Sequence, residues 1–518
     1  MATTDPRAAP DADLVVEAPG ADEIGSVPWP LLLRHRVQGR LERHERGPWI
    51  VLATALFGLL AVSSTITILA VSIPTIAEDL DASETTLTWL ITGPVLAFAV
   101  LGPSVGKLGD LWGYRRIYLV GLGGAAFFAA LTAVAWDVGS LIAFRVLAAG
   151  IGAATGPASM AMINRSFPPE RRVQALGYWS LVMAGGPVLG VVIGGPLVEA
   201  FSWRMIFVGQ VPLMLAALGL AAAVLPDTDR SEQRQRFDVA GSVVLAVGVT
   251  ALLFAINRGP EAGWTSGPVL ASFAVAPLFL ALFVRVERRA SDPLIPLEYF
   301  RRRNFAFPIG VQVFLNAAYM GGFILTPLLL QNVLGYGETR AGLVSIARPL
   351  AFAIAGPLFG YVTVRIGERT STMAGSVFVG ASMVGLAAVG TSTSAAFIMV
   401  ALALSGVGAG AALPATAATI ANSVDERDLG VVGAAQQMMT EVGLLAGIQV
   451  MQTVQVSRAE VVGELASYGD AYLVGALACV ASLGCAAFVR STPRGDASRS
   501  PGSGVGADPT PEGAGTTR

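Results

Sequence analysis

Apolar residues in this chain gather in long runs that are separated by short polar segments. Fourteen runs are long enough to cross about 30 Å of hydrocarbon as helices. A backbone inside lipid must satisfy its own hydrogen bonds, which favours helices over isolated strands. The pattern therefore predicts an all-α polytopic membrane protein with spans near residues 49–74, 87–105, 117–135, 139–163, 175–198, 204–225, 239–257, 268–285, 305–330, 341–364, 372–390, 395–420, 431–455 and 471–489.

The overall composition agrees with a membrane location. The 518 residues are 53% hydrophobic and 14% charged, whereas a soluble protein carries about 25% charged residues. Both histidines, His35 and His44, precede the first apolar run, so no span offers a histidine for proton relay or metal binding. Cys479 and Cys485 share one apolar run and are interpreted as small core residues. Neither a metal nor a cofactor is expected.

Charged residues between the runs follow an alternating pattern. Most of the 34 Lys and Arg residues lie in the tails and in every second loop, whereas the intervening loops hold mainly acids such as Glu78, Asp79 and Asp137. Basic loops stay in the cytoplasm. We therefore expect an even number of spans with both termini cytoplasmic. Frequent Ala, Gly and Arg also indicate a GC-rich bacterial genome, which favours the inner (cell) membrane.

The two halves of the chain resemble each other. The sequence after the second run reads "GKLGDLWGYRR" (106–116), and the sequence after the tenth reads "GYVTVRIGERT" (360–370). Such repeats indicate two six-helix bundles with two inserted helices and a substrate site between the halves. The predicted divisions are a basic or disordered tail (1–48), a first bundle (49–225), a linker with two inserted helices (226–304), a second bundle (305–489) and a disordered tail (490–518).

Five motifs in order resemble the major facilitator superfamily, specifically its fourteen-helix drug:proton antiporter branch of the multidrug efflux type. "GKLGDLWGYRR" is similar to that family's loop between helices 2 and 3, and "LIAFRVLAAGIGAATGP", with Arg145, to its helix 4 motif. The other three are "GGPVLGVVIGGPLVEAFSWRMIF", "DPLIPLEYFRRRNFA" and "PLLLQNVLGYGETRAGL". The resemblance implies a transporter that alternates access between two rocking bundles.

The resemblance implies that the first of these motifs is a gate that latches the two halves together on the cytoplasmic side. Glycine permits a tight turn and close helix contact. Asp110 can pair with Arg115 or Arg116 and can also face a helix N-terminus. The alternative is an ordinary solvated loop. Val364 takes the position of the aspartate in the second copy, so only the first copy is expected to act fully. The predicted gate residues are Gly106, Asp110, Gly113, Arg115 and Arg116.

The motif in the fifth span contains a stripe of small residues. Gly186, Gly190 and Gly194 are four apart, which allows a neighbouring helix to approach closely. Pro187 removes a backbone donor and weakens the helix at that point. The alternative is static packing. Val191 stands where the family's motif has a second proline, so the direction of transport is left open.

Charged residues inside spans are expected to be functional, because each costs about 2.5–3.5 kcal/mol on insertion scales. Only Arg145, Arg348 and Glu441 lie well inside a span. The resembling exporters carry an acid in helix 1, where this chain has Thr65. Glu441 is therefore the candidate that carries the proton or contacts a cationic substrate, and Arg145 is expected to tune the coupling. The alternative is that Glu441 is a structural carboxyl bonded to a neighbouring helix.

Two polar stripes are the candidate substrate contacts. Amides, aromatic rings and a thioether suit amphipathic molecules that are held without a rigid hydrogen-bond pattern. The alternative is that each residue joins two helices. The candidates are Gln312, Asn316, Tyr319, Phe323, Gln437, Trp179 and Met183.

These observations favour a secondary active transporter that exports amphipathic organic compounds in exchange for protons. Two rivals stay open: an importer or facilitator of a metabolite, possibly anionic, and a membrane sensor that does not transport. An enzyme is not expected, because no nucleophile–base set or phosphate loop occurs. The expected partners are a small molecule, protons and lipid, with neither nucleic acid nor an obligate protein partner.

Overall fold

The computed structural model describes residues 46–63, 65–82, 84–87, 89–227 and 237–491. No side chains are described at 65–68, 70–71, 74, 84–85, 92, 184, 187–200, 260–261 and 338–339. The predicted tails at 1–48 and 490–518 lie almost wholly outside these ranges.

Helices make up most of the described part of the chain, and no strand occurs in it. The first half contains α3 (Gly47–Ser63), α4 (Thr65–Asp79), α5 (Glu84–Leu87), α6 (Trp89–Trp112), α7 (Tyr114–Ala133), α8 (Val138–Gly152), α9 (Thr155–Ser166), α10 (Pro169–Ala200) and α11 (Arg204–Val224). α12 (Val239–Ala262) and α13 (Gly267–Glu287) follow. The second half contains η1 (Leu297–Arg301), α14 (Arg303–Leu328), η2 (Leu329–Val333), α15 (Glu338–Ser345), α16 (Ala347–Ile366), α17 (Glu368–Ala387), α18 (Ala395–Ala421), η3 (Glu426–Asp428), α19 (Leu429–Val462) and α20 (Glu464–Ala487).

Local sequence explains several helix starts. Gly113 and Gly367 precede α7 and α17 with φ of 92° and 87°, a backbone conformation that side chains disfavour. Asp137 begins α8 by accepting a hydrogen bond from the Ser140 backbone N–H at 2.7 Å. That bond lowers the pKa of Asp137 below its ordinary value.

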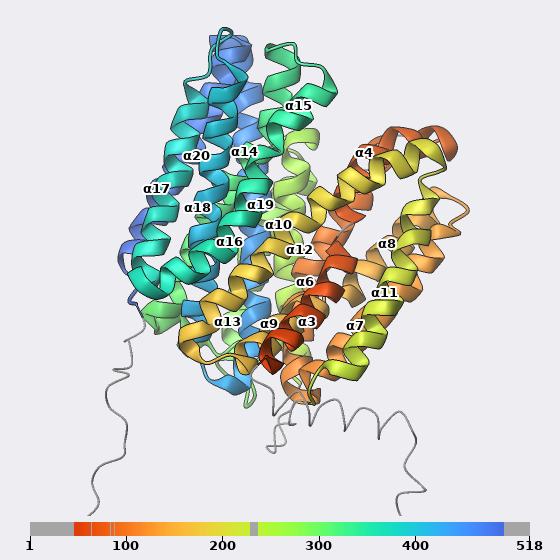
Figure 1. The fold of residues 1–518 in the computed structure, drawn as a ribbon, viewed down its shortest axis with the longest axis vertical. Coiled ribbons are helices and arrows are strands. Elements are labelled where there is room, and N and C mark those ends of the chain that lie inside the picture. The colour runs from red at the N-terminus through yellow and green to blue at the C-terminus, as the bar shows by residue number, and fades with distance from the viewer. Residues whose placement is uncertain (1–45, 64, 83, 88, 228–236, 492–518) are drawn as a thin grey trace, which may run out of the picture.

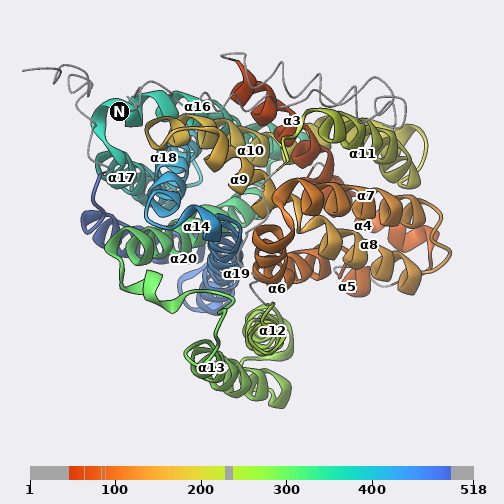
Figure 2. The same cartoon turned by 90° about the horizontal axis from the view of Figure 1, so that it is seen from below.

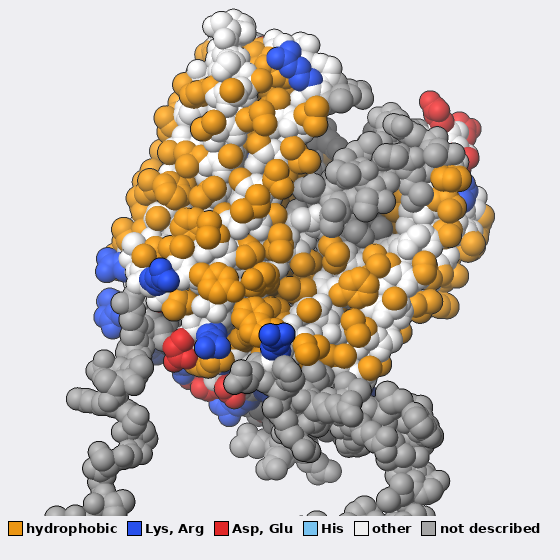
Figure 3. Space-filling model, in the orientation of Figure 1, with side chains coloured by type: hydrophobic (Ala, Val, Ile, Leu, Met, Phe, Trp, Pro, Cys, Tyr) orange, Lys and Arg blue, Asp and Glu red, His pale blue; other side chains and the backbone are white. Residues whose placement is uncertain are grey.

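Eleven helices of the described part are long and apolar enough to cross a membrane. The apolar helix α3 is shorter, with 17 residues. Large apolar side chains point outward, as at Val120 and Leu278, which are 60% and 64% exposed, and apolar atoms cover much of the face in Figure 3. Lipid tolerates such a surface, which water would not.

The helices form two lobes (Figure 1). The first lobe holds α3 to α11, and the second holds α14 to α20. α12 and α13 stand side by side at the edge of the molecule (Figure 2). The lobes meet at the end where α9 lies, which we call the closed end. Towards α4 and α15 they stand apart, and a notch opens between them in the space-filling view (Figures 1 and 3).

Two of the helix crossings between the lobes depend on glycine. At the crossing of α6 and α19, a Cβ atom on Gly106 would lie 2.5 Å from the Gly430 carbonyl oxygen. At the crossing of α10 and α16, a Cβ atom on Gly177 would lie 2.5 Å from the Gly356 carbonyl oxygen. Any side chain at these positions would therefore push the lobes apart.

Candidate functional site

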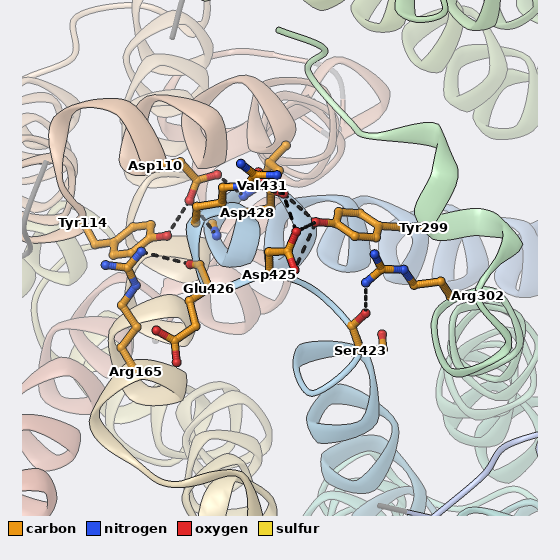
Figure 4. Close-up of polar contacts among 12 residues, drawn as sticks. Asp110, Tyr114, Arg165, Tyr299, Arg302, Ser423, Asp425, Glu426, Asp428 and Val431 are labelled. Carbon is orange, nitrogen blue, oxygen red and sulfur yellow. Dashed lines mark hydrogen bonds and ion pairs between the residues drawn. The ribbon is translucent and has the colours of Figure 1, made fainter. Parts of the chain in front are cut away.

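Asp110, near the end of α6, binds the first turn of α19 in the other lobe (Figure 4). Its Oδ1 accepts from the Gly430 backbone N–H and its Oδ2 from the Val431 N–H, both at 2.9 Å. The Tyr114 hydroxyl donates to Oδ1 at 2.5 Å. A carboxylate is favoured at a helix N-terminus, where backbone N–H groups lack partners within the helix. Contact with a helix N-terminus is one of the two contacts that the sequence predicts for Asp110.

The other possibility, an ion pair between Asp110 and Arg115 or Arg116, is not what the structure contains. Arg115 pairs with Asp227 at 3.2 Å and donates to the Ala222 carbonyl at 2.6 Å. Arg116 is exposed. The reason is helix geometry: α7 begins at Tyr114, so its first residue faces Asp110 while Arg115 turns towards the end of α11.

The turn between α18 and α19 is held by residues from both sides. From the first lobe, Arg165 donates to the Glu426 carbonyl at 2.9 Å and Arg172 to Asn422 Oδ1 at 2.8 Å. From the segment before α14, the Tyr299 hydroxyl donates to Asp428 Oδ2 at 2.5 Å. Figure 4 shows Tyr299 and Arg165 on opposite sides of this turn.

Sequence reasoning missed the role of Tyr299 and of its neighbour Arg302, which donates to the Ser423 carbonyl at 2.7 Å. Both belong to the quoted motif "DPLIPLEYFRRRNFA". The sequence signal for a polar contact was a tyrosine followed by several arginines in a segment between two apolar runs.

Glu441, one of the three charged residues that the sequence predicts inside a span, is half-buried in α19. The Gln437 amide, one turn earlier, donates to Glu441 Oε1 at 3.0 Å. On the same helix, Thr440 donates to Gln312 Oε1 at 3.0 Å. Glu441 therefore shares its stretch of α19 with a polar contact to α14.

The predicted stripe on α14 is buried and hydrogen-bonded. Gln312 and Asn316 are 3% and 4% exposed. Gln312 Nε2 donates to Thr416 Oγ1 of α18 at 3.0 Å, and Asn316 Nδ2 to the Gln312 carbonyl at 2.7 Å. The Tyr319 ring packs edge-on against Phe352 at 5.7 Å, and Phe323 is half-buried. The Gln312 amide thus joins α14 to α18 and α19, and contact with a substrate stays a prediction.

Besides Arg172 at the closed end, two arginines are buried in the described part of the lobes. Arg348, at the start of α16, is 1% exposed, and its Nη1 donates to the Tyr319 carbonyl at 3.0 Å. Within the described residues its Nε and Nη2 atoms have no hydrogen-bond partner. Arg145 of α8 is 6% exposed. The buried Arg348 guanidinium, with two nitrogens that have no partner among the described residues, is costly in this position and can bind an anionic group.

The predicted residues of α10 are only partly described. The indole N–H of Trp179 is buried without a hydrogen-bond partner among the residues that the structure covers, and Met183 is half-buried. A Cβ atom on Gly186 would lie 2.6 Å from Ser63 Oγ of α3, so the helices approach closely there. The side chains of Pro187, Gly190 and Gly194 lie outside the described residues.

Among the described residues, no group of three or more His, Cys, Asp and Glu side chains is arranged to hold a metal ion. Helices with an apolar outer surface, in two lobes joined at one end, define a polytopic membrane transporter of small molecules. The chain belongs to the Major Facilitator Superfamily, whose family model matches residues 55–448. The family predicted from the motifs is therefore confirmed, and the protein is a transporter and not an enzyme.

Similar proteins come from bacteria. The chain is 30% identical over 411 residues to the tetracenomycin C resistance and export protein of Streptomyces glaucescens, covering 79% of this chain and 76% of that protein. It is 31% identical over 408 residues to the multidrug resistance protein Stp of Mycobacterium tuberculosis, covering 78% and 75%. Its fold matches a crystal structure of a bacterial homologue of the iron transporter ferroportin in the outward-facing state, with a TM-score of 0.59, 13% identity and coverage of 84% and 98%.

Proposed function

We propose that this protein exports amphipathic organic compounds from a bacterial cell in exchange for protons, by alternating access. The observation that carries the proposal is the contact of Asp110 in one lobe with the first turn of α19 in the other. Relatives named as resistance and export proteins support export. The closed end is then cytoplasmic, both termini lie in the cytoplasm, and the notch faces outward.

The proposed membrane topology has fourteen spans in two six-helix bundles. α3 with α4, α10 and α19 add three spans to the eleven that length and composition identify. α12 and α13 are the inserted pair. The equivalent positions of Gly113 and Gly367 before α7 and α17, and the two glycine crossings between the lobes, support the pseudo-symmetry.

The Asp110 contact is strong enough to bias two conformations. Hydrogen bonds to charged groups contribute about 1.5–3 kcal/mol each, and Asp110 receives two from α19. A two-state equilibrium moves from 1:99 to 99:1 with about 5.5 kcal/mol. The Asp110 contact could therefore supply a large part of the free energy that keeps the closed end closed, and its loss would favour opening.

Glu441 is the proposed proton carrier. A charge in the bilayer is costly, and binding a proton removes it. The Gln437 amide stabilises the ionised carboxylate, and Arg145 tunes the coupling. Within the described residues the Trp179 indole N–H has no hydrogen-bond partner, and Met183 and Phe323 are half-buried. These three side chains are proposed to contact the substrate, together with Gln312, Asn316, Tyr319 and Gln437.

Arg348 favours a second candidate function. Its guanidinium is buried, and within the described residues two of its nitrogens lack hydrogen-bond partners. Such a group would stabilise an anion. The alternative is therefore a carrier for an anionic metabolite.

The test measures uptake of ethidium, an amphipathic cation, and of carboxyfluorescein, an anion, into everted membrane vesicles with an imposed pH gradient. We expect gradient-driven accumulation of ethidium. Glu441→Gln should abolish it because the amide cannot carry a proton. Glu460→Gln is the matched control, since Glu460 lies exposed near the end of the same helix.

Ethidium uptake that survives unchanged in Glu441→Gln would contradict the assignment of the proton carrier. Uptake of carboxyfluorescein alone, sensitive to Arg348→Met, would favour the anion carrier instead. Absence of flux for either probe, with binding retained, would favour a sensor that does not transport.

A further inference from the structure

Two carboxylates lie beside the N-terminus of α19. Asp428 is the N-cap residue of this helix, the position from which an aspartate side chain normally accepts the N–H bonds of the first turn. Here the Asp428 side chain makes no capping hydrogen bond. The N–H groups of Gly430 and Val431 are instead bound by Asp110 from the other lobe. The helix is therefore capped across the interface between the lobes.

The Asp428 carboxylate is bound by Tyr299 instead. The Tyr299 hydroxyl donates to Asp428 Oδ2 at 2.5 Å, and Arg427 Nε lies 3.8 Å from the same oxygen. Both groups are buried: Asp428 is 5% exposed and Tyr299 is fully buried. Figure 4 shows the Asp428 carboxylate directed towards Tyr299, while Asp110 lies on the other side of the turn, facing Val431.

Tyr299 is itself held firmly in place. Its ring packs against Phe305 at 5.8 Å, and the Arg302 guanidinium lies 4.6 Å from the ring centre. The Asp425 N–H donates to the hydroxyl oxygen at 3.4 Å. Burial and, after it, the hydrogen bond to Asp428 raise the pKa of Tyr299 above its ordinary value, so the hydroxyl keeps its proton and donates it.

We propose that Tyr299 is a positioning residue for the gate: by binding Asp428, it prevents this side chain from capping α19 and leaves the first-turn N–H groups to Asp110. When the Tyr299 contact is lost, Asp428 caps its own helix and competes with Asp110. A carboxylate in the same chain segment has the entropic advantage, because it is already beside the N–H groups. Two carboxylates at one helix end also repel each other. The closed end then opens more easily.

This inference rests on the proposed alternating access. It gives a function to the segment between α13 and α14, which belongs to neither lobe's set of membrane helices. It also predicts an unusual relation between two substitutions. Tyr299→Phe should weaken the gate, whereas Asp428→Ala should not, because alanine cannot compete for the N–H groups.

The experiment measures the distance between spin labels on the closed ends of the two lobes, in the full chain in lipid nanodiscs. Cys479 and Cys485 are replaced by alanine, and labels are placed at the exposed positions Glu170 (α10) and Arg369 (α17). Asp110→Ala serves as the control for an open gate. Tyr336→Phe, which removes the hydroxyl of a half-buried tyrosine on the loop after η2, is the matched control for the substitution.

We expect Tyr299→Phe to increase the ratio of open to closed conformations about fivefold, the effect of one typical helix N-cap. Asp428→Ala alone should leave the gate closed, and Asp428→Ala added to Tyr299→Phe should restore the closed ratio. If Tyr299 only anchors the turn, Asp428→Ala alone opens the gate and the double variant stays open, which overturns the proposal.

The two proposals fail in different ways. If Asp110→Ala opens the closed end but Tyr299→Phe does not, the role of Tyr299 is wrong and alternating access stands. If Asp110→Ala does not increase the distance between the two spin labels, Asp110 does not act as a gate and both proposals are overturned.

Discussion

At the scale of single residues, the close approach of α6 and α19 limits the size of the side chains that fit between them at the closed end. A Cβ atom on Gly430 would lie 2.5 Å from Asp110 Oδ1 and 2.7 Å from the Gly106 carbonyl oxygen. The backbone oxygen cannot move without shifting a helix. Gly430 is thus required because the two lobes touch there. Gly219, on α11, has nothing within 4 Å of the equivalent atom.

Gly430→Ala should therefore displace Asp110 from α19 and destabilise this conformation. Overpacking of this kind costs about 1–3 kcal/mol, so we expect a lower midpoint of thermal unfolding in detergent. Gly219→Ala is the control and should change the free energy of unfolding by less than about 0.5 kcal/mol. Equal midpoints for the two variants would show that the methyl group at 430 is accommodated.

At the scale of elements, α19 connects most parts of the molecule. Its first turn meets α6, its Gly443 and Gly447 pack on the α14 backbone, and its Gly433 faces Met160 of α9. In α13, in contrast, only 17% of the apolar membrane-spanning stretch is buried. This helix lies on the far side of α12 (Figure 2). α19 is therefore the helix whose position should report the state of the gate.

A disulfide between α9 and α19 should hold the closed end shut. A Cβ atom on Gly433 would lie 3.9 Å from the Met160 Cβ, within the range of about 3.5–4.5 Å that a disulfide needs. In the variant with Met160→Cys and Gly433→Cys, we expect oxidation to stop vesicle uptake and a reducing agent to restore it. Each single variant, treated with the same oxidant, should keep its uptake. Full uptake by the cross-linked protein would contradict a gate that opens between these helices.

At the scale of the whole molecule, the proposed orientation places the closed end in the cytoplasm. The contacts of Arg165, Arg172, Tyr299 and Arg302 all gather at the closed end. The loop between α17 and α18 connects the opposite ends of those helices, towards the notch. A cytoplasmic closed end therefore places residue 391 outside the cell and residue 370 inside it.

Labelling of cysteines in intact cells tests this orientation. In a background with Cys479→Ala and Cys485→Ala, an impermeant maleimide should modify Thr391→Cys and leave Thr370→Cys unmodified. Both positions are exposed, so access through the membrane decides the result. Permeabilised cells, in which both variants should react, are the control. The reverse pattern would place the closed end outside and would contradict export through an outward-facing notch.

Much of the helical pattern was predictable from the sequence. The predicted run at 204–225 is α11 (Arg204–Val224), and the run at 395–420 is α18 (Ala395–Ala421). The run at 431–455 is longer in the structure, because α19 continues to Val462. The extension contains Arg458 and Glu460 among apolar residues, so the uncharged run ends before the helix does. Helix propagation requires only that each added residue forms a backbone hydrogen bond.

The candidate site was predicted less completely. The motif around Asp110 pointed to a helix N-terminus as one possibility, but the partner is α19, which begins 319 positions later in the chain. Sequence proximity favoured Arg115, which instead reaches Asp227. The Gln312 amide shared the face expected for a substrate stripe, yet it bonds to Thr416 and Thr440 of neighbouring helices. Residue type and helical spacing do not specify the helix that a side chain meets.

The sequence by itself determined the helical membrane fold, the family and the few charges that lie inside spans. These follow from local physics, because apolar runs of sufficient length and the cost of burying charge in lipid act on each segment separately. Tertiary structure alone decided that Asp110 caps α19 and that Tyr299 binds Asp428. Both contacts join segments far apart in the chain, so they exist only after packing has brought a carboxylate, a hydroxyl and unpaired backbone N–H groups together.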